Sequence, residues 1–259
     1  MTSSESLTKF GYKFGQNGAH SARSMMLAEL EVLFQSTAPD VLQEQYKSEI
    51  CDHNLLDKPT VKSRKLTYRH LVDLYGLNAD IALFRVFRML WPLADEAQPV
   101  LALQLALLRD PLLRLSQDFI TGKPLGEQVV REDIEELLKA RDPARFSPAS
   151  LKSFAQNING SWTQAGFLKG KARKTRVAPA LAYPNVVFAT FLAYLEGATG
   201  ERLFQSRWTA LLGVPAHQLT EHAISAAQLG IIDFKQSGGI MEVRFNDFLT
   251  REEEEWRHE

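Results

Sequence analysis

Apolar residues recur every three or four positions along most of the chain, which is the spacing of one buried face of an α-helix. The pattern predicts helices at 21–34, 60–76, 79–91 and 95–108. Residues 1–19 are polar and are expected to form a flexible N-terminal arm. Residues 79–91 are apolar on nearly every side, so this helix should lie in the centre of a bundle. We therefore predict a helical domain over residues 20–122.

A helical pattern followed by a hairpin pattern occupies residues 147–177. Ser147 suits the N-cap and Pro148 the first helical turn. One apolar face follows at helical spacing, and we assign it to core packing: Leu151, Phe154, Ala155, Ile158, Trp162 and Ala165. Gly166 ends the predicted helix, and a turn at Gly170 with a return strand near residues 175–177 predicts a short β-hairpin.

Two similar units are predicted in the second half of the chain. A helix at 129–141, the helix after Ser147 and the hairpin follow the order of a winged helix-turn-helix, so residues 127–180 are named the basic unit. Helices at 185–195, 201–212 and 216–229 precede a second hairpin, whose turn is expected at Ser237, Gly238 and Gly239. Residues 185–250 are named the neutral unit. Residues 251–259 contain four consecutive glutamates and are expected to form an acidic tail facing solvent or a partner.

The predicted fold class is therefore mainly α, with an N-terminal helical bundle followed by two winged helix-turn-helix-like units that carry short β-hairpin wings. Charge separates these units. The chain has 30 Lys and Arg against 31 Asp and Glu, a formal net charge of −1. Residues 143–195 nevertheless contain seven Lys and Arg and no Asp or Glu. Cations clustered in an acid-free segment favour binding to phosphates.

Candidate nucleic-acid-binding residues come from both parts of the basic unit. The polar row of the helix is expected to be exposed and to contact bases or phosphates, and it consists of Lys152, Gln156, Asn159 and Thr163. The hairpin supplies five cations for the phosphate backbone: Lys169, Lys171, Arg173, Lys174 and Arg176. A second basic patch is expected on the helix at 60–76, at Lys62, Arg64, Lys65 and Arg69, where an ordinary solvated helix face explains the pattern equally well.

No catalytic pattern is present in the sequence. Cys51 is the only cysteine, which excludes an intrachain disulfide and a thiolate metal cluster. The glycine cluster at 160–171 lacks the spacing of a phosphate-binding loop, and His217 and His222 lack the spacing of a zinc-binding helix. We predict no catalytic residues, no cofactor and no metal. No apolar run approaches the roughly 18 residues of a membrane span, and the N-terminus lacks the layout of a signal peptide, so we expect a cytoplasmic protein.

Four strings of the chain are similar to those of a known family: NLLDKPTVKSRKLTYRHLVDLY, LFRVFRMLW, LALLRDPLLR and QNINGSWTQAGFLKGKARKTR. Through them the chain resembles the BrxA family, the small accessory proteins of bacterial BREX phage-defence systems, over most of residues 20–250. The resemblance implies a non-enzymatic protein of antiviral defence, which has been likened to the RNA-binding protein NusB and described as binding DNA. It brings no catalytic residues.

We therefore expect a non-enzymatic accessory protein that binds double-stranded DNA, mainly through the phosphate backbone, with other BREX proteins as further partners. Few aromatic residues interleave the cations, which favours backbone contacts with a duplex over stacking on single strands. RNA binding and an adaptor role, in which the basic surface meets an acidic protein, are the alternatives.

Overall fold

The computed structural model describes residues 2–143, 145–238 and 240–257. It is mainly helical, as the apolar pattern predicts. The α-helices are α1 (Ser4–Phe10), α2 (Leu27–Ser36), α3 (Gln43–Cys51), α4 (Val61–Tyr75), α5 (Ala82–Leu90), α6 (Gln98–Arg109), α7 (Pro111–Arg114), α8 (Gln117–Gly122), α9 (Arg131–Arg141), α10 (Pro148–Gln164), α11 (Tyr183–Leu195), α12 (Arg207–Leu212), α13 (Ala216–Gln228) and α14 (Arg251–Trp256). Short 3₁₀ turns lie at η1 (Ala19–Ser21), η2 (Trp91–Leu93), η3 (Asp95–Ala97) and η4 (Gly200–Leu203).

Two small antiparallel sheets accompany the helices. Strands β1 (Gln128–Val129), β2 (Leu168–Lys169) and β3 (Lys174–Arg176) form one sheet in the order β1-β3-β2. Strands β4 (Asp233–Ser237) and β5 (Ile240–Arg244) form the other. Both hairpins occur where the sequence predicts them, although Gly239 of the second turn lies outside the described residues. Strand β1 has only two residues, too few to show an alternating pattern, and it is absent from the sequence prediction.

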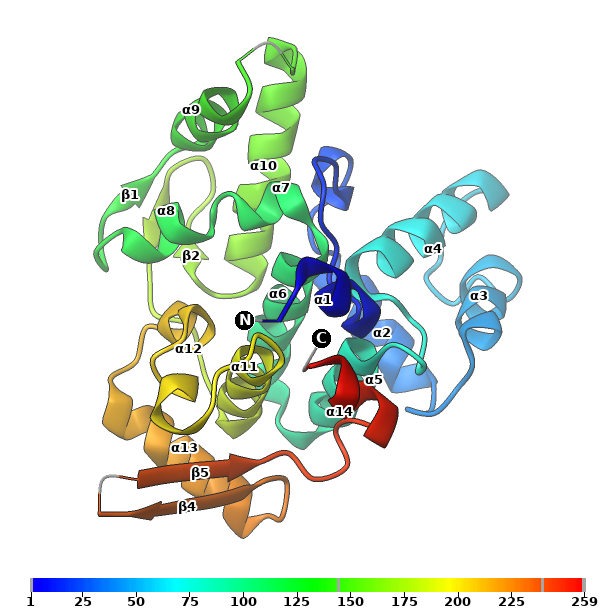
Figure 1. The fold of residues 1–259 in the computed structure, drawn as a ribbon. Coiled ribbons are helices and arrows are strands. Elements are labelled where there is room, and N and C mark those ends of the chain that lie inside the picture. The colour runs from blue at the N-terminus through cyan, green and yellow to red at the C-terminus, as the bar shows by residue number, and fades with distance from the viewer. Residues whose placement is uncertain (1, 144, 239, 258–259) are drawn as a thin grey trace.

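The centre of the molecule is built from α6 and α11, whose residues are buried on almost every side (Figure 1). Helix α11 contacts α5 and α6 as well as α12 and α13. One continuous cluster of buried apolar side chains runs through the N-terminal helices, the basic unit and the neutral unit. The helix at 185–195 therefore belongs to the shared core and not only to the neutral unit, to which its position in the sequence assigned it.

The lead-in to the chain is structured, so the prediction of a flexible arm is wrong for the described residues 4–14. Ser3 caps α1, and Phe10 and Tyr12 are buried. Phe10 packs on Trp256 of α14, with 5.5 Å between the ring centroids. Residues 4–12 therefore belong to the packed fold. Met1 lies outside the described residues.

The acidic tail also packs against the fold, contrary to the expectation that it faces solvent or a partner. Glu253 of α14 is buried, accepts a hydrogen bond from Thr250 N and forms an ion pair of 2.6 Å with Arg85. Glu254 accepts a hydrogen bond from the hydroxyl of Tyr194. Two of the four glutamates are thus held by groups of this chain, and His258 and Glu259 lie outside the described residues.

Candidate nucleic-acid interface

Helix α10 of the basic unit is formed and anchored as its sequence predicts. The Ser147 hydroxyl accepts a hydrogen bond from Ser150 N, and Pro148 stands in the first turn. Trp162 is completely buried, donates from Nε1 to Ser116 Oγ at 2.8 Å, and packs edge-on against Phe167. The apolar face of α10 is therefore fixed against the core, which decides where its polar row lies.

The polar row is exposed only in its first half. Lys152 and Gln156 are exposed, but Asn159 is only 4 % exposed and Thr163 is half-buried, with its hydroxyl donating to the Asn159 carbonyl. The expectation of an exposed Asn159 is therefore wrong. The middle of the row lies between the hairpin and the first turn of α9, which line a groove together with Gln156 and Asn159.

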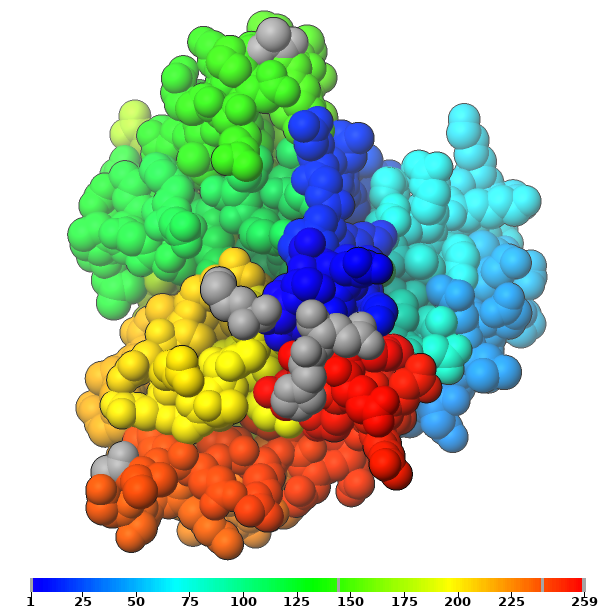
Figure 2. Space-filling view, viewed as in Figure 1, coloured from blue at the N-terminus to red at the C-terminus, as the bar shows by residue number. Residues whose placement is uncertain are grey.

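A second face of α10 is covered by residues 18–27 (Figure 2). Asn157 Nδ2 donates to the His20 carbonyl at 3.0 Å, and Gln164 Nε2 donates to Ser24 Oγ at 3.0 Å. These contacts explain why the helix predicted at 21–34 begins only at Leu27. Residues 23–26 before it form no regular element, and Met26 takes a left-handed conformation with φ 55°. This face of α10 is therefore closed to a ligand.

Hydrogen bonds link the buried side chains of His20, Asp110 and Ser161, and no sequence motif predicts this cluster. His20 Nδ1 lies 2.8 Å from Asp110 Oδ2, and His20 Nε2 lies 2.7 Å from Ser161 Oγ. This is the order of a nucleophile, a base and an orienting acid. Ser161 is completely buried, however, and its hydroxyl accepts a hydrogen bond from Met25 N. No substrate can reach Ser161 in this arrangement, so the three residues fasten residues 18–27 to α10.

The Asp110 carboxylate is the most heavily bonded group of this cluster. It accepts hydrogen bonds from the backbone and ring of His20 and caps α7 by accepting from Leu112 N and Leu113 N. Burial alone raises the pKa of the carboxyl, but the charge and hydrogen bonds of His20, with the hydrogen bond from Leu113, outweigh it and hold the pKa below its ordinary value. Asp110 is therefore ionised at neutral pH.

The hairpin of the basic unit turns at Gly170, where φ is +120° and a Cβ atom would lie 2.4 Å from the Arg173 carbonyl oxygen. Only glycine fits this turn without strain. Lys169, Lys171 and Arg173 are exposed on it. Lys174 is half-buried, donates to the Gly170 carbonyl at 3.2 Å, and has its pKa lowered by burial. Three cations are thus free to meet a polyanion, and the fourth lies closer to the protein surface.

Arg176 does not belong to this exposed group, and its prediction as a phosphate contact is wrong in the structure as it stands. It is 4 % exposed and donates to the carbonyls of Ile120, Phe167 and Val177. Its guanidinium also lies over the Phe167 ring, and burial lowers its pKa. Arg176 therefore joins strand β3 to α8 through its hydrogen bond to Ile120 and contributes to packing.

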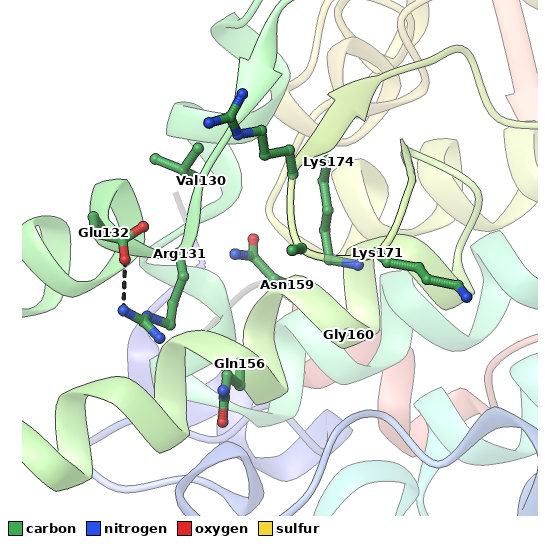
Figure 3. Close-up of a pocket in the computed structure, with 10 residues that line it drawn as sticks. Val130, Arg131, Glu132, Gln156, Asn159, Gly160, Lys171 and Lys174 are labelled. Carbon is green, nitrogen blue, oxygen red and sulfur yellow. Dashed lines mark hydrogen bonds and ion pairs between the residues drawn. The ribbon is translucent and has the colours of Figure 1, made fainter.

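An open groove of about 620 Å³ lies between α9, α10 and the hairpin (Figure 3). Its lining residues are Val130, Arg131, Glu132, Gln156, Asn159, Gly160, Lys171, Ala172, Arg173 and Lys174. Arg131 was not among the predicted site residues because carboxylates surround it in the sequence. Two of them hold its guanidinium, Glu132 and Glu135, each at 2.5 Å. The groove thus brings two residues of the predicted polar row together with three of the predicted hairpin cations, namely Gln156 and Asn159 with Lys171, Arg173 and Lys174.

The second basic patch lies elsewhere. Lys62, Lys65 and Arg69 are exposed on α4, whereas Arg64 is half-buried and donates to the Cys51 carbonyl. In the described part of the chain no residue of α4 lines the groove of the basic unit. Residues 18–27 separate α4 from α10 (Figures 1 and 2). The two predicted basic surfaces are therefore distinct.

The hairpin of the neutral unit pairs its charges. The register places Asp233 opposite Arg244 and Lys235 opposite Glu242. Arg244 also forms an ion pair of 2.6 Å with Glu242. Each cation of this hairpin thus has a carboxylate beside it, which cancels its field at a distance.

Across residues 2–143, 145–238 and 240–257, no helix is both long and apolar enough to cross a membrane. Within the same residues, no three His, Cys, Asp or Glu side chains are grouped so as to hold a metal ion.

No protein-family model and no curated protein matches the chain.

Proposed function

We propose that this chain is a non-enzymatic protein that binds double-stranded DNA through the phosphate backbone, using the hairpin of the basic unit and the first half of α10. The observation that carries the proposal is the group of exposed cations on a segment without carboxylates, formed by Lys152, Lys169, Lys171 and Arg173. Cations of this kind gain affinity for DNA by releasing the counterions condensed on it.

The arrangement of the basic unit supports a duplex as the ligand. The order β1, α9, α10, β2, β3, with a sheet of order β1-β3-β2, supports the interpretation of this unit as a winged helix-turn-helix. In that fold the second helix faces the major groove and the hairpin touches the backbone. Here one face of α10 is covered by residues 18–27, which leaves few side chains for base edges and favours binding with little sequence preference.

The place of the protein in a cell is proposed from the resemblance alone. If the chain is an accessory protein of a BREX phage-defence system, its partners are DNA and other BREX proteins. The exposed cations suit this role because they bind DNA of any sequence.

Fluorescence anisotropy with labelled duplex DNA, single-stranded DNA and structured RNA, at two salt concentrations, tests the proposed function. Four exposed cations that each neutralise one phosphate predict a log–log salt slope near −3.6 for the duplex, because each contact contributes about −0.9. Tighter binding of RNA at equal salt would favour the RNA-binding alternative. Failure to bind any of the three nucleic acids would overturn the proposal and leave the adaptor role.

A further inference from the structure

The floor of the groove carries an amide whose hydrogen-bonding capacity is unused. Asn159 is 4 % exposed, and among the described residues its Oδ1 has no hydrogen-bond partner. Buried polar groups are nearly always paired, because leaving them unpaired costs free energy. Figure 3 shows the side chain pointing into the groove between Arg131 and Lys174. Rotation of the amide about its last bond presents either its oxygen or its amino group to a ligand there.

The hairpin wall and the floor of the groove suit a ligand that carries an anionic group and a polar ring. The hairpin wall carries Lys171, Arg173 and Lys174. The opposite wall is the first turn of α9, where Glu132 lines the groove and Arg131 is ion-paired with Glu132 and Glu135, so this wall adds no unpaired positive charge. Gln156 adds a second amide to the α10 side. A cationic hairpin wall and an amide floor match the two halves of a nucleotide, namely its phosphate and its base.

A paired base cannot reach this amide. Base edges of a duplex lie at the bottom of a major groove roughly 8.5 Å deep, so a side chain that reads them must protrude from the protein. Asn159 is recessed below the hairpin and α9, so a ligand must enter the protein instead. The volume of about 620 Å³ falls within the range of roughly 300–1,000 Å³ that is usual for small-ligand sites.

The amide also selects among ligands. A phosphate offers only acceptors and would pair the amino group of Asn159 while leaving its oxygen without a donor. The edge of adenine presents a donor, N6, beside an acceptor, N7, and asparagine pairs with both. A base on the floor with its phosphate at the cationic wall therefore satisfies the groups that the structure leaves open.

We propose that the groove holds one unpaired nucleotide of a DNA strand, preferably adenine, with its base on Asn159 and Gln156 and its phosphate beside Lys171 and Arg173 of the hairpin. This inference rests on the proposed function, because the bound duplex delivers the nucleotide. Moving a base out of the stack costs least where it is already unpaired, as at a bulge or a mismatch. The basic unit would thus bind irregular duplexes in preference to perfect ones.

Binding of three labelled duplexes tests the inference: one fully paired, one with a single bulged adenine, and one with an abasic bulge at the same place. The parent protein should bind the adenine bulge about tenfold more tightly than the other two, as one well-formed pair of hydrogen bonds provides. Asn159→Leu, which keeps the volume of the side chain, should reduce this preference to within about twofold and leave the affinity for the paired duplex unchanged.

Gln156→Ala is the second variant, because Gln156 is exposed and its loss should not disturb folding. It should weaken the preference for the adenine bulge, while Ser153→Ala, an exposed change on the same helix, should not. Equal binding of the paired and bulged duplexes by the parent would overturn the inference and leave the proposed function standing. Absence of binding to every duplex would overturn both. Adenosine monophosphate serves as a competitor, and its binding without a preference for the bulge would show that the site takes a free nucleotide.

Discussion

The basic unit places two helices, α9 and α10, ahead of an antiparallel hairpin, and the neutral unit places three, α11, α12 and α13, but the two hairpins differ in how their charges are paired. Lys169, Lys171 and Arg173 project from the first hairpin without carboxylates near them in the sequence. Lys235 and Arg244 of the second hairpin stand beside Glu242. A shared backbone plan therefore does not imply a shared ligand, and the field of each hairpin depends on a few side chains.

The units also differ in what covers them. Residues 18–27 lie on α10 and are fastened by His20, Asp110 and Ser161, all completely or almost completely buried. The hairpin of the neutral unit instead rests on η4 and α13. In the basic unit, the covering segment restricts a ligand to the hairpin, the first half of α10 and the groove. The following variants separate effects on the core, which the units share, from effects on charge, which they do not.

The largest effect is expected from the buried tryptophans that anchor both units. Trp162→Ala and Trp208→Ala should each lower the free energy of unfolding by about 3–5 kcal/mol, because each removes a large buried ring and leaves a cavity. Urea denaturation of the two variants measures this loss. If Trp162→Ala kept the stability of the parent and lost DNA binding, Trp162 would be a stacking residue and its core assignment would be wrong.

Asp110→Asn should weaken the attachment of residues 18–27 to α10. Since it removes the charge that faces His20 in a buried site, we expect a loss of about 3–5 kcal/mol at neutral pH. The folded pKa of Asp110 is depressed, so its contribution is complete above the unfolded pKa of about 3.9 and disappears as the pH falls below it.

Urea denaturation on both sides of this pH checks the assignment. The difference between the parent and Asp110→Asn should shrink on the acid side. Asp118→Asn, an exposed carboxyl in α8, is the matched control and should show no such dependence. A constant difference at all pH values would mean that Asp110 does not act through its charge.

A smaller loss of stability is expected from Arg176→Ala, and it should distinguish Arg176 from the exposed cations of the hairpin. Arg176→Ala should cost about 1.5–3 kcal/mol of stability, because three buried carbonyls lose a charged donor. Arg173→Ala, three residues earlier and exposed, should leave stability nearly unchanged. Thermal denaturation of both variants tests the contrast, and equal melting of the two would show that Arg176 is not a packing residue.

The smallest effect is expected in the neutral unit. Reversing the charges of Lys235 and Arg244 to glutamate should change DNA affinity by no more than about twofold, since neighbouring carboxylates already cancel their field. Anisotropy titration with duplex DNA measures it. A large loss of affinity by a folded variant would make the second hairpin part of the interface.

Local signals in the sequence predicted much of the basic unit. Ser147, Pro148 and the apolar spacing up to Trp162 predict α10, and the turn at Gly170 with the return strand near residues 175–177 predicts the hairpin. These features depend on neighbours in the chain, where caps and periodicity operate. The sequence also separated the acid-free hairpin from the charge-paired one.

What the sequence did not reveal depends on contacts between distant residues. Asn159 shares a helix face with the exposed Lys152 and Gln156, and Arg176 follows the exposed Arg173 by three residues, so that only tertiary packing distinguishes the buried residues from the exposed ones. The backbone N–H of Met25 donates to Ser161 Oγ, 136 positions away. No local sequence pattern predicts that contact. Arg131 was also missed, because acidic residues surround it in the sequence although it lines the groove.

The salt dependence of duplex binding tests the central claim most directly. A variant with Lys169, Lys171 and Arg173 replaced by alanine should flatten the log–log slope by up to about 2.7, weaken binding to all sequences alike, and unfold like the parent. The matched control replaces Lys62, Lys65 and Arg69 on α4 by alanine and should keep the slope of the parent. A hairpin variant that retained the slope and affinity of the parent, with a flattened slope in the α4 variant, would contradict the account and move the interface to α4.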